Sequence, residues 1–111
     1  MADKLLLSTK LKNEIKKIPG DYTFYLKNIK INGVTRGCSG FVRNNKNNTY
    51  VYVDTERCVY RALPNYMYRY ADNEKDYRGY RNRWADTVPE LVRNITKLLE
   101  SDPVTERDSR V

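Results

Sequence analysis

The dipeptide Asn32-Gly33 constrains this chain more than any other feature of its sequence. Both residue types tolerate the positive φ angles that a two-residue hairpin turn requires. The preceding segment, 22–31, is rich in aromatic and β-branched residues, as a β-strand would be. The sequence therefore predicts a β-hairpin in which Ile31 pairs with Val34 and a returning strand covers 34–43.

A polar loop, 44–48, leads to a third predicted strand that begins at Thr49 and ends at about Glu56. If Arg43 pairs with Thr49, the three strands form an antiparallel meander with a fixed register. One face, the predicted core side, then carries Phe24, Leu26, Ser39, Phe41, Val51 and Val53. The other face carries Thr23, Tyr25, Lys27, Cys38, Gly40, Val42, Tyr50, Tyr52 and Asp54. A bulge near Asn28 would shift this register.

Two segments have the apolar periodicity of amphipathic helices, 5–18 near the N-terminus and 88–100 near the C-terminus. The second follows Thr87-Val88-Pro89-Glu90, a capping box with Pro in the first turn. The segment 66–70 is either a helical turn or a fourth strand. Residues 101–111 are polar and are expected to form a disordered tail. The prediction is one α+β domain over 1–100, a three- to four-stranded antiparallel meander with an N-terminal and a C-terminal amphipathic helix.

Catalytic, metal and cofactor chemistry find little support in the sequence. The chain has no His and only two Cys, Cys38 and Cys58, which are not in a Cys-x-x-Cys motif. A nucleophilic Ser, Thr or Cys would therefore lack its usual base. We expect two reduced structural thiols, no metal, no cofactor and no enzymatic activity. No early apolar run is long enough for a signal peptide or a membrane span, so a cytoplasmic protein without a membrane partner is expected.

The segment 60–84 interleaves aromatic residues with arginines, in a chain whose formal charge is +7. Arg donates forked hydrogen bonds to phosphate or carboxylate, and Tyr and Trp offer flat faces for bases or for protein hot spots. The predicted binding residues are Arg69, Tyr77, Arg78, Tyr80, Arg81, Arg83 and Trp84. Alternatively, several tyrosines complete a core that has only two Phe and two Met.

The polar face of the predicted sheet is a second candidate, formed by Tyr25, Lys27, Arg36, Tyr50 and Tyr52. Two amphipathic helices must be buried somewhere, and a helix that covered this face would convert it into a second core layer. The sequence favours that arrangement over an exposed ligand platform.

The function expected from these residues is a small, basic, non-catalytic binding module. Its partner is predicted to be nucleic acid or an acidic, nucleic-acid-handling protein. One alternative is a protein-protein inhibitor without nucleic-acid affinity, and another is a homodimeric or homo-oligomeric subunit paired through an exposed sheet edge. In general appearance the chain resembles the small accessory proteins of bacterial phages and conjugative elements, a group that includes anti-CRISPR and other anti-defence inhibitors. That resemblance implies action by occupying an interface or a nucleic-acid channel and assigns no residue.

Overall fold

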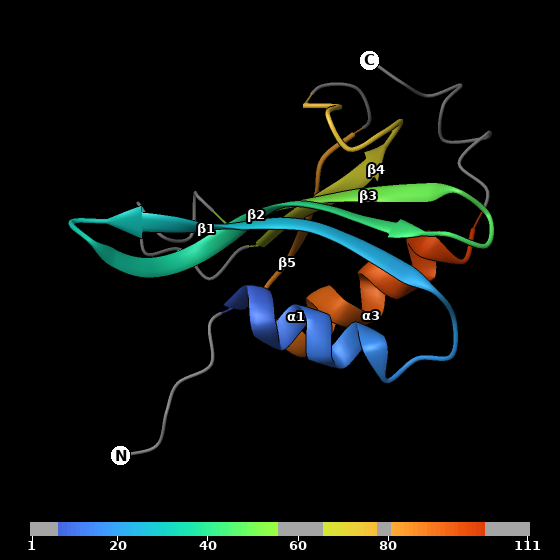
Figure 1. The fold of residues 1–111 in the computed structure, drawn as a ribbon, viewed down its shortest axis with the longest axis horizontal. Helices are drawn as coiled ribbons and strands as arrows, with labels where there is room; N and C mark the ends of the chain where they lie inside the picture. Colours follow the sequence, from blue (N-terminus) through green and yellow to red (C-terminus); the bar gives the residue numbers. More distant parts are fainter. Residues whose placement is uncertain (1–6, 56–65, 78–80, 102–111) are drawn as a thin grey trace.

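The structure, a computed structural model, describes residues 7–55, 66–77 and 81–101. The elements follow in the order α1 (Leu7–Lys16), β1 (Tyr22–Ile31), β2 (Val34–Asn44), β3 (Thr49–Asp54), β4 (Tyr66–Ala71), β5 (Arg83–Ala85) and α3 (Val88–Leu99). The five strands form one antiparallel sheet in the order β1-β2-β3-β4-β5, and both helices lie on the same side of it (Figure 1). The predicted α+β meander with two terminal helices is confirmed, with five strands in the described part.

The β1–β2 hairpin turns at Asn32 and Gly33, whose φ angles are 52° and 80°. Ile31 pairs with Val34 as predicted, but the register shifts between Ile29 and Lys30. This bulge places one extra residue in the ladder, so every pair farther from the turn is displaced by one. The predicted pairing is therefore wrong from Ile29 to the start of β1.

The β2–β3 connection also differs from the prediction by one residue, because Asn44 extends β2 and pairs with Thr49. Side-chain oxygens fix this turn: Asn44 Oδ1 accepts a hydrogen bond from the Lys46 N–H and Asn47 Oδ1 accepts one from the Thr49 N–H, both at 3.0 Å. The two one-residue errors lie on either side of β2, so they invert the predicted faces of β2 only. The faces of β1 and β3 are as predicted, whereas Phe41 lies on the face away from the helices and Val42 on the helix side.

Two strands follow β3 in the described residues: one settles whether 66–70 is a helical turn or a strand, and the other was not predicted. Tyr66 to Ala71 is a strand rather than a helical turn, and it pairs with β3. Three residues, Arg83–Ala85, then pair with β4 as β5. Three residues are too few to show the alternation by which a strand is recognised in a sequence, so β5 was not predicted.

The main core lies between the helices and one face of the sheet. Five helix residues and three strand residues at its centre are fully buried: Leu11, Ile15, Leu91, Ile95, Leu99, Val42, Val51 and Val53. Burying each of the Leu and Ile side chains contributes about 1.5 to 3 kcal/mol. The expectation that a helix covers the face with Tyr25, Tyr50 and Tyr52 is wrong, because both helices use the opposite face.

Specific polar contacts fix the helix ends. Thr87 is the N-cap of α3 and its hydroxyl accepts a hydrogen bond from the Glu90 N–H at 3.2 Å, as the predicted capping box requires. The Glu90 carboxylate accepts from the Asp86 N–H at 2.9 Å, one residue before the cap. At the other end, the side-chain amides of Asn44 and Asn47 each donate to the Leu99 carbonyl at 2.9 Å. The β2–β3 turn therefore caps α3 and holds it on the sheet.

Some predictions fall outside the described residues: the helix start at Leu5, the strand end near Glu56, Cys58 and the tail after residue 101. Among the residues that are described, no helix is long and apolar enough to span a bilayer.

Substitution of Gly40 tests how closely the β1 and β2 backbones approach each other. Its φ is +142°, and a Cβ there would overlap the carbonyl oxygen of Tyr25. We expect Gly40→Ala to lower the free energy of unfolding by at least about 3 kcal/mol, from backbone strain and steric overlap together. Gly33→Ala is the matched control, because its φ is +80° but nothing lies within 4 Å of the added Cβ. The control is expected to lose only about 1 to 2 kcal/mol. Chemical denaturation measures both, and equal losses would contradict the role of space.

Candidate binding surface

One face of the sheet is turned away from α1 and α3 (Figure 1) and is here called the open face. The strand register places three cross-strand rows of side chains on it. The first row is Thr23, Arg43, Tyr50 and Ala71; the second is Tyr25, Phe41, Tyr52 and Arg69; the third is Lys27, Ser39, Asp54, Met67 and Trp84. The secondary candidate residues Tyr25, Lys27, Tyr50 and Tyr52 thus share one face with Arg69 and Trp84 from the primary set.

Aromatic rings form the floor of the open face. Phe41, Tyr50 and Tyr52 are buried, together with Ala71. The Phe41 and Tyr52 ring centroids are 4.9 Å apart. The ring of Tyr77 stands edge-on to both, at 5.3 Å from Phe41 and 5.8 Å from Tyr52. The alternative that tyrosines of the segment 60–84 complete the core holds for Tyr68 and Tyr70, which are buried, and not for Tyr77, which is exposed.

Arg69 is a buried residue that packs under the aromatic floor. Its side chain is only 3% exposed, and its guanidinium lies 4.6 Å from the Tyr52 ring centroid. The guanidinium donates hydrogen bonds to the carbonyls of Tyr70 at 2.9 Å and Asp76 at 2.8 Å, and the Asp76 carboxylate lies 3.9 Å away. These contacts hold the segment 72–77, and with it Tyr77, against the sheet. The donors of Arg69 thus serve the fold rather than a ligand at the surface.

Three exposed rings stand on this buried floor. The exposed fractions are 38% for Tyr25, 57% for Tyr77 and 42% for Trp84. Trp84 belongs to the open face because it pairs with Met67, which packs against the buried aromatic cluster. Among the described residues, only Val34 is a further large exposed apolar side chain. Three of the four large exposed hydrophobic side chains among the described residues therefore lie on one face.

Not every predicted residue lies on the open face. Arg83 pairs with Tyr68, a core residue, so it lies on the helix side, and its guanidinium is 5.4 Å from the Tyr70 ring centroid. Arg81 is exposed just before β5. Arg78, Tyr80 and the side chain of Arg36 are outside the described residues.

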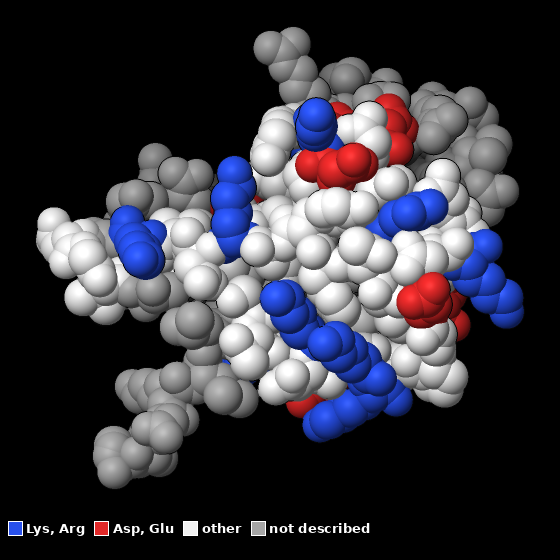
Figure 2. Space-filling model, in the orientation of Figure 1, with Lys and Arg blue, Asp and Glu red and all other residues white. Residues whose placement is uncertain are grey.

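The electrostatics of the open face are mixed rather than basic. Lys27 is exposed, and Arg43 lies 5.7 Å from the Tyr50 ring centroid. The segment 72–77, however, has three acids and one lysine, a net charge of −2. Acidic side chains gather where the chain leaves β4, on the side opposite the helices (Figure 2). Phosphate would be repelled at this end of the face.

Burial keeps the central hydroxyls neutral. The pKa of Tyr52 is raised by burial and then by the nearby Asp54 carboxylate, to which the hydroxyl donates at 3.0 Å. The pKa of Tyr50 is also raised, again mainly by burial. Phe41 and Asp76 belong to the site but were missed from the sequence, whereas Asp54 was placed on this face without being named as a site residue. The register error hid Phe41, and nothing in the local sequence identifies Asp76 as a partner of Arg69.

The described residues present neither a reactive thiol nor a group of metal-ligating side chains. Cys38 is fully buried, and its thiol pKa is raised to about 12 by burial and then by Asp54. At neutral pH it is therefore a protonated core thiol rather than a nucleophile. Within the described residues, no three His, Cys, Asp or Glu side chains are grouped as metal ligands would be.

Comparison of the chain with known protein families, curated proteins and solved structures found no significant match.

The variant Arg69→Lys tests whether the Arg69 hydrogen bonds stabilise the open face. Lysine keeps the positive charge but cannot donate to two carbonyls with a planar fork. We expect the free energy of unfolding to fall by about 2 to 4 kcal/mol, because charge-assisted hydrogen bonds are lost in a buried site. The exposed Arg81→Lys is the matched control and is expected to change stability by less than about 0.5 kcal/mol. Urea denaturation compares the two, and a neutral result for Arg69→Lys would refute the support role.

The reactivity of the Cys38 thiol tests whether this side chain is shielded from solvent in the core. In a Cys58→Ser variant, the only remaining thiol is Cys38. The rise in pKa from 9.0 to about 12 lowers its thiolate fraction about 1000-fold near neutral pH. We expect no reaction with a disulfide reagent at about pH 8 in the native state, and full reaction in denaturant. The readout is reagent absorbance, and rapid native labelling would contradict the buried thiol.

Proposed function

We propose that this chain is a non-catalytic binding module whose open face binds a protein partner. One observation carries the proposal: Tyr25, Tyr77 and Trp84 are exposed together on a sheet face that neither helix covers. Large aromatic side chains with a polar tip or edge are the residue types that dominate the centres of protein interfaces.

The open face is suited to binding because its rings are held in place before a partner arrives. Tyr77 packs edge-on against Phe41 and Tyr52, and Tyr25 lies stacked on Tyr50 with centroids 6.5 Å apart. A side chain that is already ordered loses little conformational entropy on binding. The Arg69 contacts to the segment 72–77 extend this order to the segment that carries Tyr77.

The charges favour a protein over nucleic acid at this face. The segment 72–77 contributes a net charge of −2 beside the exposed rings. A single-stranded nucleic acid that stacked on these rings would bring its phosphates close to Asp72 and Glu74. A protein partner of mixed charge meets no such repulsion, and rim acids together with Lys27 and Arg81 would set its orientation. The function class that fits is an inhibitor or accessory subunit that occupies an interface, in the cytoplasm, without cofactor or catalysis.

Trp84 provides a direct test because it is the only tryptophan in the chain. Titration with single-stranded oligonucleotides is expected to leave its emission unchanged, because the open face is not their site. Quenching of Trp84 by oligonucleotides would contradict the proposal and indicate base stacking on this face.

The partner itself can be trapped through the open face. A photoreactive amino acid at Tyr77 is expected to crosslink one protein in the producing cells, whereas the same group at the exposed Asn13 of α1 is not. Binding of the purified partner is then measured by calorimetry. Tyr25→Ser, Tyr77→Ser and Trp84→Ser together are expected to weaken it at least about 100-fold.

Val34→Ser serves as the control, because Val34 is 50% exposed but lies at the β1–β2 hairpin. It is expected to bind like the wild type. Equal crosslinking at Tyr77 and Asn13, or equal losses in the triple variant and the control, would contradict the open face as the site. If the crosslinked protein is a second copy of this chain, light scattering will give a doubled mass that the triple variant abolishes.

A further inference from the structure

Helix α1 concentrates the positive charge of the chain. Residues 7–17 contain four lysines and one glutamate, a net charge of +3 out of +7 for all 111 residues. The single acid, Glu14, pairs with Lys17 at 3.0 Å on the surface, where such pairs contribute little. Lys12 and Lys16 are four residues apart on one helix face and repel each other. Lys16 also lies in the last turn of α1, where a cation complements the helix dipole. The four lysines and one acid leave this helix with a net positive surface.

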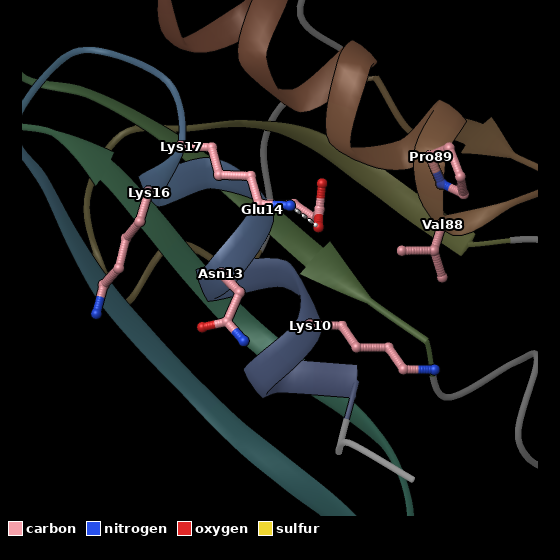
Figure 3. A pocket seen from close by; sticks show the side chains of 7 residues that line it. All are labelled: Lys10, Asn13, Glu14, Lys16, Lys17, Val88 and Pro89. Atoms are coloured by element: carbon pink, nitrogen blue, oxygen red, sulfur yellow. Dashed lines mark hydrogen bonds and ion pairs between the residues drawn. The ribbon is translucent and has the colours of Figure 1, made fainter. Parts of the chain in front are cut away.

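Three of these four lysines, Lys10, Lys16 and Lys17, border an open hollow of about 770 Å³ between α1 and the first turn of α3 (Figure 3). Its lining is formed by Lys10, Asn13, Glu14, Lys16, Lys17, Val88 and Pro89. Lys10 extends toward Val88, and Glu14 turns toward Lys17. Lys16 points to the other side of the helix, where its ammonium lies 5.8 Å from the Phe24 ring centroid. The lysines therefore flank α1 rather than converge on one point, which suits an extended anion better than a single small one.

The basic row and the acidic cluster lie on opposite sides of the molecule. Lysine and arginine side chains follow α1, whereas acidic side chains gather beside the chain that leaves β4, across the sheet (Figure 2). Asp86 and Glu90 flank the Val88–Pro89 wall in the sequence, and the Glu90 carboxylate is turned back to the Asp86 N–H. The lysines that flank α1 therefore lie on the other side of the sheet from the acidic segment 72–77.

We propose that the lysines that flank α1 and its C-terminal end, Lys10, Lys12, Lys16 and Lys17, dock the phosphodiester backbone of nucleic acid. From Lys10 to Lys16 the helix extends about 9 Å, over which one strand of duplex DNA presents about three phosphate charges. Flexible ammonium groups on an exposed helix bind such a line of charges without reading its sequence. This surface is separate from the open face, and the inference goes beyond the proposed protein binding.

The experiment is fluorescence anisotropy of labelled single- and double-stranded oligonucleotides at about 50 mM and about 200 mM salt. The wild type is expected to bind with a Kd of roughly 10⁻⁶ to 10⁻⁴ M at physiological salt, weakening steeply as salt rises. The variant Lys10→Gln, Lys16→Gln and Lys17→Gln is expected to bind at least about tenfold more weakly. Its slope of log K against log salt should fall by about 2 to 3.

The matched control removes the same charge elsewhere: Lys30→Gln, Lys46→Gln and Lys97→Gln, all exposed and all outside α1. It is expected to change binding by less than about threefold. Thermal melting checks that both variants fold, and the open-face triple variant is expected to keep its oligonucleotide affinity. Equal losses in the two lysine variants, loss in the open-face variant, or no wild-type binding at low salt would each overturn the proposal. A preference between the single and double strand identifies the form that α1 docks.

Discussion

The packing of both helices on one face of the sheet is the constraint on which the rest of the structure depends. Leu11 and Ile15 of α1 and Leu91 and Ile95 of α3 are fully buried against that face. No helix is then left among the described elements to cover the other face. That face shields its interior with its own tyrosine and phenylalanine rings, so aromatic surface remains exposed above them. The candidate binding surface is thus a direct result of how the core is built.

The same arrangement separates two kinds of surface. The open face combines ordered rings with nearly balanced charge, and the opposite side presents the lysines of α1. Because the sheet lies between them, occupation of one surface does not sterically block the other. Under the two proposals, a molecule of 13.1 kDa would contact a protein and a polyanion at once, as an adaptor or as an inhibitor of a nucleic-acid-bound enzyme does.

Local signals in the sequence predicted local structure well. Asn32-Gly33 gave the hairpin and Thr87 to Glu90 gave the start of α3, because each pattern acts over a few residues. The faces of β2 were inverted because a bulge and the side-chain hydrogen bonds of Asn44 and Asn47 decide the register. Arg69 was predicted to contact a partner, yet its side chain is buried and donates to the carbonyls of its neighbour Tyr70 and of Asp76, which the chain after β4 returns to it. Spatial partners of that kind have no signature in the local sequence.

The meander order of the strands also bears on how the chain folds. Every paired strand is the neighbour in sequence of its partner, so the sheet grows by successive local pairings, which are kinetically accessible. The caps on Leu99 instead join residues 55 and 52 positions apart in sequence. During synthesis the strands emerge before the helix that completes their apolar layer. A ribosome that stops shortly before Val88 therefore releases a sheet with an unfinished core, a species that exposes apolar surface to chaperones and proteases.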